Sequence, residues 1–154
     1  MKVVFLKNHP EKINDVSTMI YKEFVENTRS TKSYQDVYEY FSNVKEHTLP
    51  ITLIAIEKGI CLGTISIFEN NLEIRKLYTP WLASLYTKSE YRCKGVGQLL
   101  INKAIEFVKK LGYEELYLRT EEASEYYKNR GWKLLETVSD EYYEKIDVFK
   151  IELK

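Results

Sequence analysis

The chain has 154 residues, of which 44% are hydrophobic and 14% aromatic, so it can bury a sizeable core and is not disordered in composition. Lysine plus arginine number 23, and aspartate plus glutamate also number 23. The sequence therefore has no excess of basic charge of the kind that would indicate nucleic-acid binding. Two isolated cysteines, Cys61 and Cys93, indicate neither a disulfide framework nor a metal site. We expect a single domain spanning residues 1–154.

No stretch of the sequence predicts export or membrane insertion. The apolar run at residues 3–6 is too short for the core of a signal peptide. No segment approaches the roughly 18 continuous apolar residues of a membrane span. We therefore expect a cytoplasmic protein without a membrane partner.

The first 50 residues predict one strand, at 3–6, and two helices. Pro10 suits the first turn of the first helix, and Ser33 is expected to cap the second. Apolar residues recur at three- and four-residue spacing in both helices. These positions are Ile13, Val16, Met19, Ile20 and Phe24 in the first, and Tyr34, Val37, Tyr38, Phe41 and Val44 in the second.

From residue 51 onward, strands and helices follow one another. The sequence predicts a hairpin of strands 52–56 and 61–68, a strand at 81–86, a helix at 96–111 ended by Gly112, a strand at 115–119, a helix at 121–130 ended by Gly131, and strands at 132–138 and 147–153. This order predicts a mixed α/β sheet with helices on both faces.

The most informative stretch is the turn at residues 92–97, Arg-Cys-Lys-Gly-Val-Gly, between a predicted strand and a long helix. Arg92 and Lys94 bring positive charge, and Gly95 and Gly97 lack a Cβ, so successive backbone N–H groups can converge on one anion. The helix start adds unpaired N–H groups and the positive end of a dipole. We interpret this turn as a phosphate-binding site.

Two common phosphate loops do not fit the spacing of this turn. A P-loop requires Gly-Lys followed by Ser or Thr, and the dinucleotide fingerprint requires a third glycine where this chain has Leu100. An ordinary basic loop at a helix start remains the alternative to a phosphate site.

The turn and its flanks resemble the GNAT superfamily of N-acetyltransferases. Residues 92–97 match the family's Gln/Arg-x-x-Gly-x-Gly/Ala motif, residues 81–87 resemble its fourth strand, and residues 123–132 resemble its A-x-x-x-Y-x-x-x-G-F/W segment. The resemblance covers residues 50–135 well. It implies the α/β GNAT (acyl-CoA N-acyltransferase) fold, a mostly antiparallel sheet of about six to seven strands flanked by about four helices.

The resemblance also implies acetyl-CoA as the co-substrate. Backbone N–H groups of the turn would bind its pyrophosphate, and the end of the preceding strand would pair with pantetheine through freed backbone groups. The cofactor-binding residues implied are Leu85, Tyr86, Thr87, Arg92, Cys93, Lys94, Gly95, Val96, Gly97 and Gln98. Thr120 stands where the family often has Asn, so the resemblance does not assign the cofactor contact that this Asn makes.

Tyr127 is the catalytic residue that the resemblance implies, because family enzymes often place a tyrosine four residues before the glycine, here Gly131. A positioned phenol can protonate the thiolate that leaves when an amine attacks a thioester. The chain has 13 tyrosines, so position and not residue type selects Tyr127.

Several carboxylates could serve as the general base that deprotonates the amine: Glu69, Glu73, Asp36 and Glu39. We favour Glu73, which lies on the loop before the strand at 81–86. Cys93 is not expected to carry an acetyl group, because the family transfers it directly in a ternary complex. His9 and His47 fit no metal or triad spacing, and no metal is expected.

The implied function is an acetyl-CoA-dependent N-acetyltransferase acting on the primary amine of a small molecule, such as a polyamine, an aminoglycoside-like antibiotic or an amino-acid derivative. Residues 121–147 include eight acidic and four basic residues. This acidic excess is consistent with a binding site for a cationic amine, and equally with an ordinary solvated surface. Two alternatives stay open: acetylation of a protein N-terminus or lysine, and a non-catalytic acyl-CoA sensor or interaction module. Late strands could pair between the subunits of a homodimer.

Overall fold

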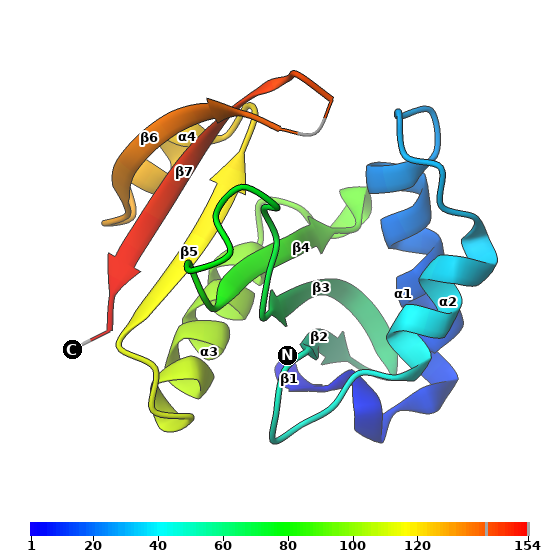
Figure 1. Cartoon of the computed structure of the whole chain (residues 1–154). Coiled ribbons are helices and arrows are strands. Elements are labelled where there is room, and N and C mark those ends of the chain that lie inside the picture. The colour runs from blue at the N-terminus through cyan, green and yellow to red at the C-terminus, as the bar shows by residue number, and fades with distance from the viewer. Residues whose placement is uncertain (141, 154) are drawn as a thin grey trace. The chain divides into compact units, whose positions relative to one another are not determined.

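The computed structural model describes residues 1–140 and 142–153. Its strands are β1 (Lys2–Phe5), β2 (Ile51–Glu57), β3 (Ile60–Phe68), β4 (Trp81–Thr87), β5 (Glu115–Thr120), β6 (Lys133–Ser139) and β7 (Lys145–Glu152). They form one sheet in the order β1-β2-β3-β4-β5-β7-β6 (Figure 1). The β1–β2, β2–β3, β5–β7 and β6–β7 pairs are antiparallel and β4–β5 is parallel. The predicted mostly antiparallel sheet is confirmed.

The α-helices of the described chain are α1 (Ile13–Ile20), α2 (Tyr34–Ser42), α3 (Val96–Lys110) and α4 (Ser124–Lys128). Short 3-10 helices at Leu6–Asn8, Pro10–Lys12 and Ser89–Tyr91, and a π-helical turn at Tyr21–Val25, complete the set. The predicted helix at 121–130 is wrong in length, since its regular part is only α4. None of the described helices combines the length and the apolar character that a membrane span requires.

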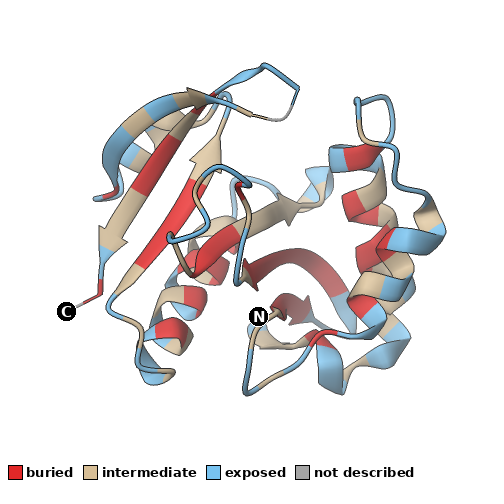
Figure 2. Cartoon of the chain, viewed as in Figure 1, coloured by how far each residue is buried: buried red, intermediate tan, exposed pale blue. Residues whose placement is uncertain are grey.

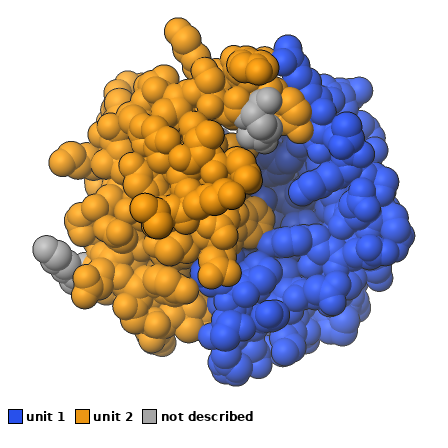
Figure 3. Space-filling view, viewed as in Figure 1, with its two compact units in different colours: residues 1–67, 84–104 blue, residues 68–83, 105–154 orange. Residues whose placement is uncertain are grey.

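The chain divides into two compact units (Figure 3). Unit 1 comprises residues 1–67 and 84–104, and unit 2 comprises residues 68–83 and 105–154. The boundary within β4 falls at Ser84, whose φ of 55° is left-handed and interrupts the extended backbone.

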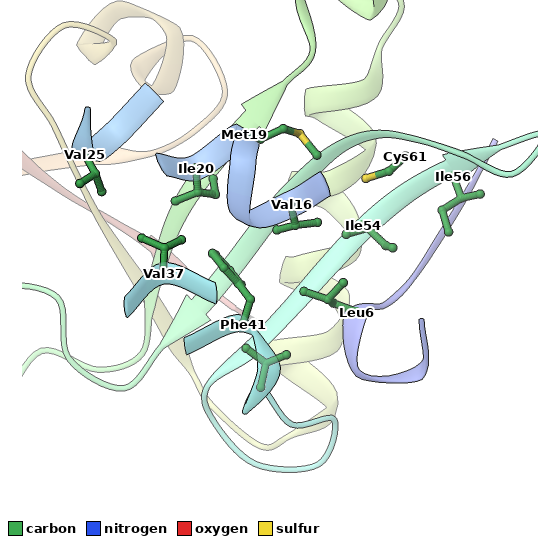
Figure 4. Close-up of a cluster of buried hydrophobic side chains, with 11 residues drawn as sticks. Leu6, Val16, Met19, Ile20, Val25, Val37, Phe41, Ile54, Ile56 and Cys61 are labelled. Carbon is green, nitrogen blue, oxygen red and sulfur yellow. The ribbon is translucent and has the colours of Figure 1, made fainter. Parts of the chain in front are cut away.

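The core of unit 1 forms where α1 and α2 lie side by side and pack their apolar residues against β2 (Figures 1 and 4). Val16 and Ile54 are fully buried in it. The cluster consists of Leu6, Val16, Met19, Ile20, Val25, Val37, Phe41, Val44, Ile54, Ile56 and Cys61. The predicted apolar faces of both helices are therefore confirmed at most positions.

Phe24 is the exception, because its side chain is 43% exposed. After α1 the backbone widens into the π-helical turn, in which the N–H of Glu26 donates to the carbonyl of Tyr21 at 2.7 Å. A π-helical turn holds more residues than an α-helical one, so the three- and four-residue spacing no longer keeps side chains on one face. The prediction for Phe24 assumed an uninterrupted α-helix and was wrong.

Ser33 caps α2 as predicted. Its hydroxyl accepts a hydrogen bond from the N–H of Asp36 at 3.1 Å, and the Asp36 carboxylate accepts one from the N–H of Ser33 at 2.9 Å. This reciprocal pair satisfies two backbone donors at the helix start. Asp36, one of the candidate bases, therefore has a structural role here.

In unit 2, β7 lies between β5 and β6, and Figure 2 shows buried residues along β5 and β7 but not along β6. Its core contains Leu72, Trp81, Tyr117, Ile146 and Val148. The loop at 69–80 adds Tyr78, whose ring stacks on that of Tyr117 at 4.6 Å between centroids. Arg75 fastens the same loop to β6 with hydrogen bonds of 2.6 and 2.8 Å to the two carboxylate oxygens of Glu136.

Candidate active site

The turn before α3, at residues 92–97, has left-handed residues at two alternate positions, and we refer to it as the nest. Cys93 and Gly95 have φ values of 63° and 82°, whereas Arg92 has −70°. Left-handed residues placed at alternate positions turn neighbouring N–H groups toward one side of the chain, where they can bind an anion. α3 begins directly after this nest, with the N–H of Leu99 donating to the carbonyl of Gly95 at 3.0 Å. The N-terminal end of the α3 dipole adds to the attraction.

The space beside Gly95 is open. A Cβ built on this glycine would meet no described atom within 4 Å. Positive φ, not crowding within the protein, therefore selects glycine here. Open space beside this exposed turn leaves room for a pyrophosphate, which must approach the main chain closely.

Arg92 connects the turn to the end of β4. Its Nε donates to the carbonyl of Thr87 at 2.9 Å, and its guanidinium lies 5.4 Å from the centroid of the Tyr86 ring. The ammonium of Lys94 lies 5.8 Å from the Tyr91 ring. Both basic side chains are exposed, so they add positive charge beside the nest while the backbone forms it.

Gly63 of β3 lies against the end of β4 and the start of α3, and the sequence analysis did not identify it. A Cβ on Gly63 would lie 2.7 Å from the carbonyl oxygen of Tyr86, 3.2 Å from Cα of Thr87 and 3.3 Å from Val96. The end of β4 and the start of α3 can therefore approach β3 closely only because residue 63 has no side chain. An isolated glycine inside a β-branched strand is the signal that could have revealed this contact.

The end of β4 is held within unit 1. The N–H of Lys88 donates to the carbonyl of Leu62 at 3.0 Å, and its ammonium pairs with Asp15 of α1 at 2.8 Å. Leu85, Tyr86 and Thr87 are half-buried. The described β4–β5 register consists of the pair Trp81 and Tyr117, so it does not include these three predicted pantetheine-binding residues.

Tyr127 lies on α4 in unit 2, directly before a Schellman turn. Gly131 has a φ of 88°, its N–H donates to the carbonyl of Lys128 at 3.3 Å, and the N–H of Trp132 donates to the carbonyl of Tyr127 at 3.1 Å. The predicted left-handed end at Gly131 is therefore confirmed. The same turn explains the spacing of tyrosine, glycine and tryptophan, because it joins residues 127 and 132 directly.

The ring of Tyr127 is packed, and its hydroxyl has no hydrogen-bond partner among the described residues. The ring centroid lies 5.9 Å from that of Trp132, 6.2 Å from that of Phe149 and 5.2 Å from that of Tyr126. Burial raises the pKa of Tyr127 to about 12. The phenol is therefore protonated at neutral pH.

The candidate bases lie on the surface. Glu73 has a side chain that is 79% exposed and pairs with Lys76 at 3.3 Å. Glu39 accepts a hydrogen bond from Gln35 at 3.3 Å on α2. The role of Glu73 as the base stays a prediction.

Thr120, which stands at the position of the family's Asn, has a structural role in this chain. Its hydroxyl accepts a hydrogen bond from the N–H of Ala123 at 3.0 Å, just before α4. The ten predicted cofactor residues thus come together in unit 1, whereas Tyr127, Glu73 and Thr120 belong to unit 2.

The described residues contain no group of three or more His, Cys, Asp or Glu side chains that could hold a metal ion. His9 lies 3.2 Å from Glu11, and His47 is 88% exposed beside Glu46. Neither histidine lies in the turn or on α4. The donors at the turn before α3 are backbone N–H groups and basic side chains, and α4 in unit 2 carries the Tyr127 phenol.

A mostly antiparallel sheet in which a left-handed turn leads from β4 to α3 fits the acyl-CoA N-acyltransferase fold. The sequence model of the Acetyltransferase (GNAT) family matches residues 16–132, and the chain belongs to this family. No curated protein matches the chain in sequence.

Solved structures support the fold. An aminoglycoside 6'-N-acetyltransferase complexed with coenzyme A is 17% identical with a TM-score of 0.77, over 100% of this chain and 98% of that one. The protein yncA from Salmonella typhimurium, solved with its cofactor acetyl-CoA, is 14% identical with a TM-score of 0.73, over 100% and 94%. A ribosomal-protein-alanine N-acetyltransferase from Brucella melitensis is 16% identical with a TM-score of 0.77, over 99% and 100%.

Proposed function

We propose that this protein transfers the acetyl group of acetyl-CoA to the primary amine of a small molecule. The observation that carries the proposal is the nest formed by Cys93 and Gly95 at the start of α3. Its left-handed residues, the helix start beside it and its open space suit the pyrophosphate of coenzyme A. Membership of the acetyltransferase family supplies the reaction class, and the similar structures solved with coenzyme A and acetyl-CoA support the choice of cofactor.

In this proposal the cofactor lies along the end of β4. Leu85, Tyr86 and Thr87 offer backbone groups to pantetheine, and the residues from Arg92 to Gln98 bind the pyrophosphate chiefly through their main chain. Arg92 keeps the turn attached to Thr87 through the hydrogen bond at 2.9 Å. Since acetyl-CoA is an intracellular metabolite, the cytoplasm is the proposed location.

The proposed reaction is a direct transfer. The amine loses a proton to a carboxylate, for which we propose Glu73 acting through water, and its lone pair attacks the thioester carbonyl. Backbone donors near the end of β4 stabilise the oxyanion. The C–N bond forms first, and the tetrahedral oxyanion then collapses as the C–S bond breaks. The departing thiolate takes a proton from Tyr127, and the proton that the new C–N nitrogen loses returns to Tyr127 through water.

For the acceptor we propose a cationic small amine. The acidic excess between residues 121 and 147 attracts such a molecule by Coulomb interaction. The aminoglycoside N-acetyltransferases among the similar structures support the same class. A peptide N-terminus is the competing acceptor, as in the ribosomal-protein-alanine enzyme.

The test measures coenzyme A thiol release from acetyl-CoA with polyamines, aminoglycosides, amino acids and short peptides, beside calorimetric binding of acetyl-CoA. We expect release that depends on a small amine. Thiol release with peptides alone would show that the acceptor is a peptide and not a small amine. Binding of acetyl-CoA without turnover on any acceptor would favour a sensor, and absence of binding would refute the assignment of the nest.

A further inference from the structure

Asp147 of β7 holds two hydroxyl groups from different elements of unit 2. Ser124, the first residue of α4, donates its hydroxyl to Oδ2 of Asp147. Thr137 of β6 donates its hydroxyl to Oδ1 at 2.6 Å. The half-buried carboxylate therefore connects the helix that carries Tyr127 to two strands of the sheet.

α4 depends on such attachments, because a helix of five residues is not stable alone. Its N-cap residue, Ala123, provides no side-chain cap, although its N–H donates to the hydroxyl of Thr120 at 3.0 Å. The Schellman turn at Gly131 fixes the other end. The bond between Ser124 and Asp147 is thus a direct side-chain link from α4 to the sheet.

β7 contacts α4 at two points on one face. Asp147 and Phe149 are two residues apart on a strand, so their side chains point to the same side. Asp147 binds Ser124, and the ring of Phe149 lies 6.2 Å from that of Tyr127. Ser124 and Tyr127 are three residues apart on the helix and share its face as well. Two attachments on matching faces determine how the helix is rotated about its axis.

We propose that Asp147 is a positioning residue, which through Ser124 fixes the rotation of α4 and so the direction of the Tyr127 hydroxyl. The inference rests on the proposed role of Tyr127 as the proton donor. Removing the link lets α4 rotate while the packed ring keeps the helix attached. A displacement of about 1 Å at a catalytic group is enough to cost up to about 100-fold in rate.

The experiment compares Asp147→Asn and Ser124→Ala in the wild-type and in the Tyr127→Phe backgrounds, with kcat and the KM for acetyl-CoA as readouts. We expect each variant to lower kcat about tenfold in the wild type, with the KM changed by less than about twofold. In the Tyr127→Phe background neither should lower kcat further, because the group they position is already gone. Ser124→Thr keeps the hydroxyl and should therefore retain the kcat of the wild type.

Glu115→Gln is the matched control. Glu115 also accepts two side-chain hydrogen bonds in unit 2, from Tyr117 at 2.7 Å and from Lys150 at 2.9 Å, but it lies at the start of β5. It should leave kcat unchanged. Should Asp147→Asn fail to fold, Ser124→Ala removes the same bond from the helix side.

Three results would overturn the inference. One is an unchanged kcat in Ser124→Ala, and another is an equal loss in both backgrounds, which would indicate a purely structural role. The third is full turnover by Tyr127→Phe, which by itself shows that the proposed acid is wrong. Loss of turnover by Tyr127→Phe with unchanged Asp147 and Ser124 variants would refute the positioning role alone.

Discussion

A Cβ on Gly63 would lie 2.7 Å from the carbonyl oxygen of Tyr86, a distance that real Cβ atoms essentially never show. The obstructing atom belongs to the backbone of β4, so no side-chain rotation can relieve the contact. The position of the β4 end, and of the nest that follows it, thus depends on a missing side chain in β3.

We therefore expect Gly63→Ala to displace the end of β4 and weaken acetyl-CoA binding. Overpacking of this kind costs about 1–3 kcal/mol, which corresponds to a Tm lower by roughly 3 to 10 °C. Gly59→Ala is the control, because Gly59 has a φ of 78° and open space and lies in the β2–β3 turn. It should lose stability while keeping its affinity for acetyl-CoA. Calorimetry and thermal unfolding measure both, and an unchanged affinity in Gly63→Ala would contradict the prediction.

Gly95→Ala should weaken acetyl-CoA binding by about tenfold or more, since the added methyl group occupies space beside the nest and the left-handed backbone strains an L residue by about 1–2 kcal/mol. Gly112→Ala provides a matched strain control, with a φ of 95° and open space at the other end of α3. Calorimetric titration should show a large loss for Gly95→Ala only. Equal affinities in the two variants would argue that Gly95 does not face the cofactor.

Tyr127→Phe should lower kcat by about 100-fold, because proton donation by a positioned acid commonly contributes this much. The ring contacts with Trp132 and Phe149 remain, so the Tm should change little. Tyr126→Phe, on the neighbouring residue, should retain activity. Steady-state kinetics with the preferred amine tests both variants.

The raised pKa of Tyr127 also has a consequence for the pH profile. Burial raises this pKa to about 12, so the protonated phenol persists throughout the neutral and mildly alkaline range. Activity should therefore show no loss from tyrosine ionisation between about pH 7 and 10. A descending limb in that range that is present in the wild type and absent from Tyr127→Phe would contradict this expectation.

Glu136→Gln should reduce stability at neutral pH and have little effect in acid. Hydrogen bonds from Arg75 hold the pKa of Glu136 below its ordinary value of 4.5, and Tyr78 contributes in the same direction. A carboxylate whose pKa is lowered by folding stabilises the folded state above its unfolded pKa, and this contribution disappears as the pH falls through the folded pKa. The stability difference between wild type and variant should thus shrink below about pH 4.5.

Urea unfolding at two pH values measures this difference. Glu125→Gln is the control, because the Glu125 side chain is 82% exposed and pairs with Lys128 at 3.6 Å on the surface. Such a pair contributes little at any pH. A Glu136→Gln effect that stays constant from neutral to acid pH would show that its carboxylate charge is not involved.

Cys93→Ser should retain most of the turnover, since direct transfer requires no acetyl-cysteine. The residue contributes a left-handed φ of 63° and its N–H to the nest, and serine keeps the N–H. Mass spectrometry of the protein mixed with acetyl-CoA should detect no acetylated Cys93. Loss of all turnover with retained acetyl-CoA binding would instead support a covalent acetyl-cysteine intermediate at Cys93.

The sequence by itself determined the features that depend on a few neighbouring residues. The Ser33 cap, the glycine ends at Gly112 and Gly131, the order of strands and helices and the strand-to-helix turn at 92–97 follow from local rules of backbone geometry and periodicity. The family resemblance on these residues is confirmed by the match to residues 16–132.

Only the tertiary structure decided the features that join distant residues. The approach of Gly63 to Tyr86 depends on how closely two strands pack, and the link between Asp147 and Ser124 depends on the register of β7. The exposure of Phe24 depends on a π-helical turn that α-helical periodicity does not anticipate. The spacing of residues along the chain predicts which side chains lie on the same helix or strand. Strand register and packing determine which side chains of different helices and strands contact one another.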